Sequence, residues 1–379
     1  MHWKIRIMSN YYYIIPKADF FLQGRGGAVS HVVGAAEGLL DNEQNVFVDG
    51  CQGVEEYISN DRLVSRYSTR SRFRIIDDLL NALSVIAFYS KKEGVILHFR
   101  KTWSLLVAIC LRPICFRSLR RNNKVIFEVN GLSFENRKDF SGKLFFYLSS
   151  SLTARVLSGS SLVYVVSESI RDALNKKGCE SVVVIPNGSP KYIGSVMSKD
   201  GDPGMIFYGK FRAYNEFHVL REAFHLICER MPRFKLYIVG FGPEEGEINR
   251  LFNDVSGVSV YGETSLEGIS DLICQHAGPI CGVVPVRDAS GSDFLSPIKL
   301  FDYFSLGLPA IVSSSVRLDT YLEECTAVKT YSAGDAESLA RTAMSLFDST
   351  IFLSAQLSAK NASYATSWSS RMKQLLDSL

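Results

Sequence analysis

The sequence predicts an α/β fold made of two Rossmann-like domains that face each other across a cleft. Three observations carry this expectation. Short apolar runs alternate with helix-length segments along the whole chain, the pattern restarts after a polar stretch at 198–204, and 379 residues are enough for two domains.

Strand-like runs occupy both halves of the chain. In the first half they are Lys4 to Met8, Val46 to Asp49, Gly94 to His98, Lys124 to Val129 and Ser161 to Val166. In the second half they are Met205 to Tyr208, Phe234 to Val239, Val258 to Tyr261, Ile280 to Pro285 and Ala310 to Ser313. One helix is predicted where apolar residues recur three or four places apart before a proline, at Phe217, Leu220, Phe224, Ile227, Met231 and Pro232. We expect domains at 1–190 and 204–360, followed by a helix at 361–379 that packs back on the first domain.

Composition and missing motifs exclude several classes of protein. With 46% hydrophobic and 12% aromatic residues, the chain has the composition of a folded protein. The longest apolar run, Trp103 to Leu111, is about half of the roughly 20 residues that a membrane-spanning helix needs. The eight cysteines form no CxxC pair, which favours reduced core thiols over disulfides or zinc ligands. Lys4 and Arg6 interrupt the early apolar pattern, so no secretory h-region is predicted and a cytoplasmic protein is expected. No HExxH or GxSxG motif occurs, so metallohydrolase and serine hydrolase chemistry lose their usual support.

Positive charge is concentrated in one segment. The net charge is only +3, yet the segment from His98 through Lys124 contains seven Lys and Arg residues and no acid. Apolar residues there recur at roughly helical spacing, at Trp103, Leu106, Val107, Cys110 and Ile114. A helix of this kind can lie among lipid headgroups with its cations near anionic lipid, although a core helix followed by a solvated basic loop has the same pattern. The expected membrane or acceptor surface consists of Arg112, Arg117, Arg120 and Arg121; no nucleic-acid partner is expected.

Glycine-rich turns suggest phosphate binding. Gly24 to Ala28 opens a helical pattern, and free N–H groups at a helix start attract phosphate, although a plain strand-to-helix turn looks the same. Gly240-Phe241-Gly242-Pro243 follows a strand and imitates a dinucleotide fingerprint, but its third glycine comes one place late. Gly204 to Lys210 is not a P-loop, because Phe211 stands where a magnesium-binding Ser or Thr is required.

The stretch from Ser290 to Phe304 is the most informative. A loop of small residues leads into a helix whose first position is expected at Pro297, so that backbone N–H groups can hold a diphosphate. Lys299 can compensate phosphate charge, and Asp302, on the same helix face, can accept hydrogen bonds from ribose hydroxyls. An N-capped amphipathic helix with a solvated ion pair is equally consistent with the local sequence.

Taken in order, these segments resemble those of GT-B glycosyltransferases of family 4 over nearly the whole chain. Gly26 to Val32 is similar to the family's GGAxxHV opening, and Val166 to Ser169 with Val184 to Gly188 resembles its VSE…VIPNG crossing into the second domain. Three later segments also resemble family motifs. Tyr208 to Lys210 with Glu222 to Phe224 is similar to VGR…EAF, and Ile238 to Pro243 is similar to IVGxGP. Ser296 to Tyr303 with Gly307 to Pro309 is similar to SPxKLFEY…GxP.

The resemblance implies an enzyme that moves a sugar, with retention and without a metal or other cofactor, from a UDP- or GDP-sugar to a glycan or lipid-linked glycan acceptor in bacterial-type surface polysaccharide assembly. By position, Lys210 corresponds to the family's phosphate-binding Arg, Asp302 to the second acid of its EX7E pair, and Gly27 to the glycine beside the diphosphate. The implied catalytic residues are Lys210, Asp302 and Asn130. The implied donor-binding residues are Gly27, Gly209, Arg212, Gly242, Ser292, Asp293, Ser296 and Lys299.

The chain departs from the family pattern at three places. The first EX7E acid falls at Phe294, with Asp293 one place away. The usual Lys after the Arg aligns with Asn215, which leaves Arg212 as a replacement. Residues 128–131, Glu-Val-Asn-Gly, stand where many members carry a His after the fourth strand.

These departures keep two other functions open. One is a catalytically weak GT-B subunit that binds a sugar nucleotide or a partner transferase, and the other is a sugar-nucleotide epimerase. In each case we expect a cytoplasmic protein that can associate with the inner face of the plasma membrane.

Overall fold

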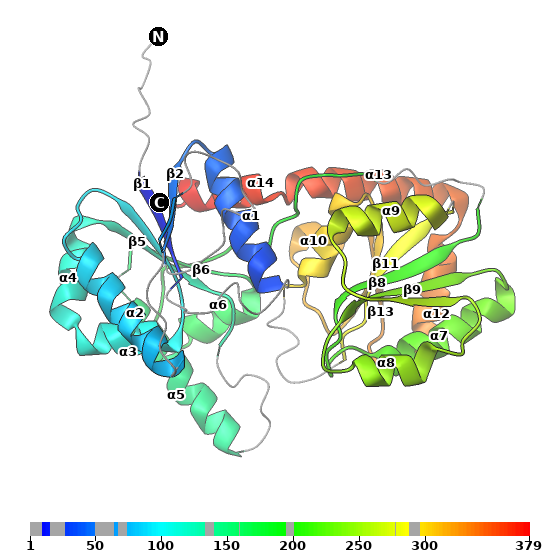
Figure 1. Ribbon diagram of the computed structural model, residues 1–379, viewed down its shortest axis with the longest axis horizontal. Coiled ribbons are helices and arrows are strands. Elements are labelled where there is room, and N and C mark those ends of the chain that lie inside the picture. Colours follow the sequence, from blue (N-terminus) through cyan, green and yellow to red (C-terminus); the bar gives the residue numbers. More distant parts are fainter. Residues whose placement is uncertain are drawn as a thin grey trace, which may run out of the picture. The chain divides into compact units, whose positions relative to one another are not determined.

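The computed structural model describes residues 10–15, 27–49, 64–66, 74–132, 140–158, 160–194, 201–276, 278–287 and 296–379. It divides the chain into two compact units, unit 1 at Met1–Pro186 with Trp368–Leu379 and unit 2 at Asn187–Ser367. Each unit is a parallel sheet with helices on both faces (Figure 1), as expected for Rossmann-like domains. None of the seven described cysteines forms a disulfide.

The boundaries of the units differ from the expected ones at two places. Unit 2 begins before the polar linker, because the backbone N–H of Ile193 donates to Ser305 O at 2.9 Å and that of Ser189 to Thr366 O at 2.8 Å. The chain returns to unit 1 at Trp368, where 361 was expected, because the preceding helix continues to Ala365.

Unit 1 is a parallel sheet in the order β3-β2-β1-β4-β5-β6-β7. The strand order reverses between β1 and β4. Its strands are β1 Asn10–Ile14, β2 Asn45–Asp49, β3 Val64–Arg66, β4 Ile96–Arg100, β5 Lys124–Val129, β6 Leu162–Val165 and β7 Val182–Val184. Its helices are α1 Gly27–Asp41, α2 Arg74–Tyr89, α3 Trp103–Leu111, α4 Pro113–Asn122, α5 Phe140–Leu157, α6 Glu168–Asn175 and α14 Trp368–Asp377.

Unit 2 has the strand order β10-β9-β8-β11-β12-β13, again with parallel neighbours. Its strands are β8 Gly204–Lys210, β9 Lys235–Phe241, β10 Val258–Tyr261, β11 Ile280–Val284, β12 Ala310–Ser313 and β13 Val328–Tyr331. Its helices are α7 Phe217–Arg230, α8 Glu245–Phe252, α9 Leu266–His276, α10 Ile298–Ser305, α11 Thr320–Glu324, α12 Ala336–Leu346 and α13 Ser349–Ala365.

The sheet of unit 2 is buried on both faces. Along β8, Met205 and Phe207 belong to the core shared with α7, α8 and α12, whereas Ile206 belongs to the core shared with α9 and α10. Successive side chains of a strand point to opposite faces, so a sheet covered on both sides needs apolar residues at every position. This explains why uninterrupted apolar runs predicted the central strands correctly.

The strands that the sequence did not predict have identifiable causes. β3, β7 and β13 lie at sheet edges and were not predicted, although the edge strand β10 was. In β3 (Val-Ser-Arg) and β13 (Val-Lys-Thr-Tyr) polar residues interrupt the apolar ones. β1 was not predicted because its sequence, Asn-Tyr-Tyr-Tyr-Ile, contains no run of aliphatic residues, yet its three tyrosines are buried. The predicted run Lys4 to Met8 lies outside the described residues. The predicted helix that ends before Pro232 is confirmed as α7.

The C-terminal helix α14 packs on α1 through two glycines. A Cβ atom on Gly34 would lie 2.1 Å from Trp368 Nε1, and one on Gly38 would lie 2.3 Å from Trp368 O. Asn42 Nδ2 donates to Ser369 O at 2.8 Å, and Met372 is fully buried. The close approach of α14 to α1 therefore requires glycine at both positions, and α14 completes the core of unit 1.

We expect Trp368→Ala to lower the free energy of unfolding of unit 1 by about 3–5 kcal/mol, because it empties the α1 groove. Trp368 is 6% exposed. The matched control is Trp103→Ala, at a position that is 39% exposed, which should cost less than about 1 kcal/mol. Urea unfolding followed by circular dichroism measures both; equal losses would show that α14 does not stabilise the unit.

Candidate functional site

In unit 2 the predicted donor residues gather where the strand order reverses. The reversal lies between β8 and β11, and the chain leaves both strands at the same edge of the sheet. Doubly wound sheets bind their ligands at this point, outside the carboxyl ends of the strands. Lys210 ends β8, Arg212 follows it, and Ser296 and Lys299 lie at the start of α10, which is the helix after β11.

Lys299 reaches the end of β8 because residue 209 is a glycine. Gly209 has a φ of +124°, and a Cβ atom there would lie 2.7 Å from Lys299 Cε. Lys299 is half-buried, with its Nζ 5.0 Å from the centroid of the Phe207 ring. Burial lowers the pKa of Lys299 to about 8, an effect that Asp302 opposes and Arg212 reinforces. The Lys299 ammonium group therefore lies in the site and is partly removed from water.

Asp302 lies one turn further along α10 and is 6% exposed. Burial raises the pKa of its carboxyl to about 7, and the charge of Lys299 opposes this rise. Among the described residues the carboxylate has neither a hydrogen-bond partner nor an ion pair, Lys299 included. The alternative of a solvated ion pair on an amphipathic helix is therefore wrong.

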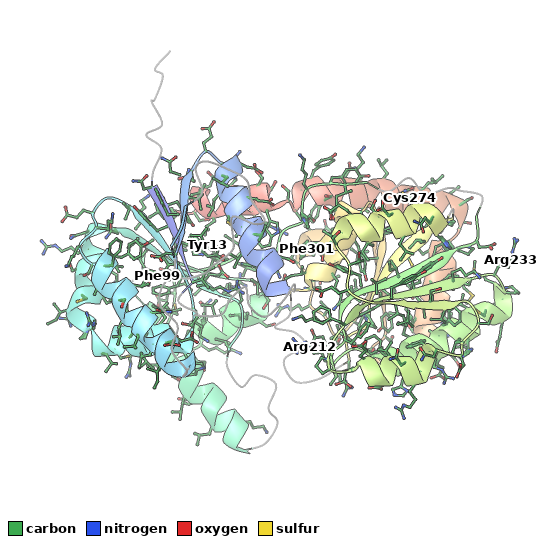
Figure 2. The ribbon with its side chains drawn as sticks, in the orientation of Figure 1. Tyr13, Phe99, Arg212, Arg233, Cys274 and Phe301 are labelled. Atoms are coloured by element: carbon green, nitrogen blue, oxygen red, sulfur yellow. The ribbon has the colours of Figure 1, made fainter. Side chains whose placement is uncertain are left out.

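Two further cations lie at the same edge of the sheet. Lys210 Nζ lies 5.1 Å from the centroid of the Phe241 ring. Arg212 is exposed, at the end of unit 2 where β8 and β9 terminate (Figure 2). Its backbone N–H donates to Asn215 Oδ1 at 3.1 Å, and Asn215 is buried, so the residue in place of the family's Lys fixes the loop after β8. Arg212 carries the positive charge of this loop.

The loop before α10 is anchored at its last residue. The backbone N–H of Asn187 donates to Ser296 Oγ at 3.1 Å, and Asn187 Nδ2 donates to Ser296 O at 2.7 Å. Ser296, a predicted donor-binding residue, therefore accepts two hydrogen bonds from Asn187 that anchor the loop. Pro297 is the N-cap and α10 begins at Ile298, one residue later than predicted, because the ψ of Pro297 is extended at 105°.

The remaining predicted donor residues have mixed outcomes. Gly27 is the first residue of α1. A Cβ atom on Gly242 would lie 2.5 Å from Phe211 O, so packing against the chain itself already requires this glycine. Ser292 and Asp293 lie outside the described residues.

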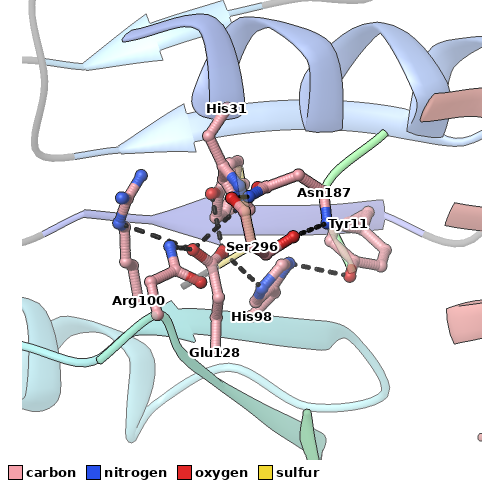
Figure 3. A network of polar contacts seen from close by, with 9 residues as sticks. Tyr11, His31, His98, Arg100, Glu128, Asn187 and Ser296 are labelled. Carbon is pink, nitrogen blue, oxygen red and sulfur yellow. Dashed lines mark hydrogen bonds and ion pairs between the residues drawn. The ribbon is translucent and has the colours of Figure 1, made fainter. Parts of the chain in front are cut away.

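In unit 1 a buried carboxylate collects polar side chains from several elements (Figure 3). Glu128, on β5, is fully buried. Its Oε2 accepts a hydrogen bond from Tyr13 Oη at 2.7 Å and lies 3.3 Å from His98 Nε2. Its Oε1 lies 3.0 Å from His31 Nε2 and 3.4 Å from Arg100 Nε. We call Glu128 and these four partners, together with Asn130, the Glu128 cluster.

Asn130, a predicted catalytic residue, belongs to this cluster. Its Nδ2 donates a short hydrogen bond to Glu128 Oε1, whereas its Oδ1 is buried and has no hydrogen-bond partner among the described residues. The cluster includes side chains of β1 and β4, the two strands between which the strand order of unit 1 reverses. The rings of Tyr13 on β1 and His98 on β4 stack with their centroids 4.4 Å apart.

Neighbouring side chains in the cluster stabilise the ionised form of Glu128. Burial alone would raise the pKa of Glu128, but the charges of His31 and Arg100, with hydrogen bonds from His31 and His98, hold it well below its ordinary value. Burial lowers the pKa of His98. A neutral His98 can donate from Nε2 to Glu128 and accept from Tyr11, whose Oη lies 3.0 Å from Nδ1. No group of three or more His, Cys, Asp or Glu side chains in the described part of the chain could hold a metal ion.

Sequence reasoning placed Asn130 but missed the carboxylate that holds it. A signal was present: β4 and β5 carry His98 and Glu128 inside otherwise apolar strands. Charged residues are almost never fully buried unless they are paired, so a Glu in such a strand indicates partners on neighbouring strands.

The basic segment of unit 1 forms two helices where one was expected. Pro113 starts α4, so the helix breaks at Arg112. Of the five apolar residues expected on one helix face, Leu106 is fully buried. The other four are exposed, as is Leu111; they are Trp103, Val107, Cys110 and Ile114. Arg112, Arg117 and Arg121 are exposed, but the Arg120 guanidinium lies over the Phe116 ring and donates to Ser158 O at 3.4 Å. No described helix is both long enough and apolar enough to cross a membrane.

Comparison with known proteins agrees with this architecture. The model of the family "Glycosyltransferase Family 4" matches residues 25–189, and that of "Glycosyl transferases group 1" matches residues 202–349. No curated protein matches the chain significantly.

Solved structures similar to the chain cover nearly its whole length. Sucrose-phosphate synthase from Thermosynechococcus elongatus has a TM-score of 0.69 at 14% identity, with 97% of this chain and 98% of that one covered. Anabaena HepE in complex with UDP and glucose has a TM-score of 0.67 at 14% identity, with coverages of 98% and 100%. The lipopolysaccharide outer core galactosyltransferase WaaB has a TM-score of 0.64 at 9% identity, with coverages of 97% and 98%.

At such low identities these neighbours establish the fold, and the family models establish the relationship. The two models match adjacent parts of the chain, one in each unit, and together span most of it. The chain therefore belongs to the GT-B glycosyltransferases of the group 1, family 4 type.

Proposed function

We propose that the protein is a retaining glycosyltransferase that moves a sugar from a UDP-sugar to a glycan or lipid-linked glycan acceptor in the assembly of a surface polysaccharide. The observation that carries the proposal is the set of cations at the switch point of unit 2. Lys210, Arg212 and Lys299 surround one edge of the sheet, and none of the three has an ion-pair partner among the described residues. A nucleoside diphosphate would supply the missing negative charge.

The proposed reaction needs these cations most in the transition state, when the bond between the sugar and the diphosphate breaks. The bond between the anomeric carbon and the diphosphate oxygen breaks, the acceptor oxygen attacks from the same face, and the acceptor proton passes to the departing phosphate. Negative charge therefore develops on the diphosphate, where fixed cations and the free N–H groups of α10 stabilise it. We propose that these groups replace a metal ion.

Asp302 provides the second half of donor recognition in this proposal. Its carboxylate is buried without a partner, and two ribose hydroxyls would satisfy it. UDP is favoured over GDP because the structurally similar HepE has been crystallised with UDP and with UDP-glucose.

Lys210→Ala should lower turnover at least tenfold, because the departing diphosphate loses a fixed cation. The protein is incubated with a panel of UDP- and GDP-sugars, and nucleotide release is measured with and without acceptor. Lys235→Ala, at the opposite end of the sheet of unit 2, is the matched control and should keep native turnover. Native turnover in Lys210→Ala would remove Lys210 from the site, inhibition by a chelator would contradict metal independence, and an absence of transfer from every donor would favour the structural-subunit or epimerase alternative.

The affinity for UDP should fall as pH rises above about 8. The pKa of Lys299 is lowered to about 8, so its charge is present below this pH and is lost above it, while the phosphates of UDP stay ionised. Lys299→Arg keeps a positive charge at every pH in the range and should remove the fall. Calorimetric titration of both proteins between pH 7 and pH 9.5 measures the effect, and an identical decline in both would show that Lys299 does not contact the diphosphate.

We further propose that α3 and α4 bring the enzyme to an anionic membrane surface. The side chains of Trp103, Leu111 and Ile114 are exposed, and three exposed arginines lie beside or after them in the chain, at Arg112, Arg117 and Arg121. The neighbouring helices α2 and α5, which both contact α3, expose further apolar side chains, at Ile76, Leu80, Phe88, Leu144, Tyr147 and Leu148. Apolar side chains shallowly buried among cations are the pattern of a peripheral membrane surface, and the cationic part selects anionic lipid.

The protein should therefore sediment with vesicles that contain anionic lipid and be released as salt rises through a few hundred millimolar. Changing Arg112, Arg117 and Arg121 to Glu should abolish the binding, at about 1 kcal/mol for each cation lost. The matched control changes three exposed arginines of unit 2 to Glu, at Arg221, Arg230 and Arg250, which alters the net charge equally. Equal sedimentation with neutral vesicles, or equal loss in the control, would leave a soluble acceptor as the better interpretation.

A further inference from the structure

Unit 2 begins with segment 187–194, which contacts both ends of α10. At the start of the helix, Asn187 donates two hydrogen bonds to Ser296 (Figure 3). At the end of the helix, the backbone N–H of Ile193 donates to Ser305 O at 2.9 Å. The helix that carries both titratable groups of the donor site is therefore held by this segment at its two ends.

The two attachments differ in how they depend on side chains. The hydrogen bond from Ile193 joins backbone atoms, so any residue other than proline keeps it. At the start of α10 the shorter of the two hydrogen bonds comes from a side chain, since Asn187 Nδ2 donates to Ser296 O at 2.7 Å. Asn187 is buried, so water does not readily replace its amide. The side chain at position 187 therefore decides how firmly the start of α10 is held.

The first turn of α10 has no side-chain cap of its own. A helix commonly begins at a Ser, Thr, Asp or Asn whose side-chain oxygen accepts a hydrogen bond from the first turn. The N-cap of α10 is Pro297, which has no such oxygen and forms no capping hydrogen bond. Ser296 directly precedes it. The contact between Asn187 and Ser296 therefore fixes the start of this helix where a cap would otherwise do so.

Lys299 is the second residue of α10, so its place depends on this first turn. A Cβ atom on Gly209 would lie 2.7 Å from Lys299 Cε, and Lys299 Nζ lies 5.0 Å from the centroid of the Phe207 ring. Burial is the main cause that lowers the pKa of Lys299; the charge of Asp302 raises this pKa and that of Arg212 lowers it further. A displacement of the first turn would move the ammonium group out toward water.

We propose that Asn187 is a positioning residue for the donor: through Ser296 it holds the first turn of α10 where the Lys299 ammonium group can meet the diphosphate. This inference rests on the proposed function and adds to it a residue that acts through another part of the chain. The amide is needed because its N–H group faces a carbonyl oxygen. Ala at position 187 would leave the Ser296 carbonyl without this donor.

Calorimetric titration with UDP tests this role in Asn187→Ala. At pH 7 the affinity should fall about fivefold, because the hydrogen bond that holds the start of α10 is lost. The pH above which affinity declines should rise by about one unit, because a more hydrated Lys299 has a higher pKa and keeps its proton longer. A residue that only stabilises the fold would not move this pH profile.

The matched control removes a buried hydrogen bond of the same segment that does not involve α10. Ser189 Oγ lies 2.9 Å from Thr366 Oγ1, and both side chains are buried. Ser189→Ala should lower the free energy of unfolding as Asn187→Ala does, yet keep the affinity for UDP within twofold and its pH profile unchanged. Urea unfolding followed by circular dichroism shows whether each variant folds. If Asn187→Ala does not fold, Asn187→Ser replaces it, since its side chain is polar but too short to reach Ser296 O.

Three results would overturn the inference. They are native affinity with a native pH profile in the folded variant at position 187, a loss of affinity that is equal at every pH, and the same upward shift in Ser189→Ala. A native protein that binds no UDP at any pH would instead refute the proposed transfer from a UDP-sugar, on which the inference rests.

Discussion

A parallel sheet that is covered by helices on both faces has almost no place for charge except where its strands end. In both units the central strands are buried along most of their length, and helix-facing positions on either side are apolar. Burying a charge within such a sheet requires partners, whereas the carboxyl ends of the strands can open toward ligand. The distribution of polar side chains in this protein follows from that constraint.

The two units meet the constraint in opposite ways. In unit 2 the cations at the switch point are Lys210, Arg212 and Lys299, and none of them forms an ion pair with another described residue. In unit 1 the charges are paired inside the protein, where one carboxylate meets a guanidinium and two imidazoles. The unpaired set is suited to an anion supplied by a ligand, whereas the paired set has no net demand for one and can only orient neutral groups.

The sequence predicted most of the central strands because their burial on both faces makes them continuous apolar runs. It failed at three of the four edge strands, β3, β7 and β13, and at the central strand β1, where buried tyrosines replace aliphatic residues. It also placed one helix across Arg112, because periodicity alone continued past a proline that starts a second helix. Hydrophobic periodicity and intrinsic propensity indicate whether a segment can form a helix or a strand. Where a helix ends, and whether an edge strand forms, depends on neighbours that are distant in the chain.

The site was predictable to the extent that it follows motifs along the chain. Lys299 and Asp302 were found from one helix, but their burial, which moves both pKa values toward neutrality, depends on Gly209 and on the core beneath α10. Ser296 was assigned to the donor, although its polar groups are used by Asn187, 109 residues earlier. Contacts of this kind join segments that no local pattern relates.

The contacts of Glu128 likewise join segments that are distant in the chain. They also bear on Asn130, which follows β5 at the place where many family members carry a His. A His at that place can donate or accept, and its tautomer depends on its surroundings. An Asn has the same ambiguity between oxygen and nitrogen until an ionised acceptor removes it, and the carboxylate two residues earlier on β5 does so. Glu128 therefore fixes the orientation of the Asn130 amide, and the carboxylate is itself secured by side chains from β1, β4 and α1.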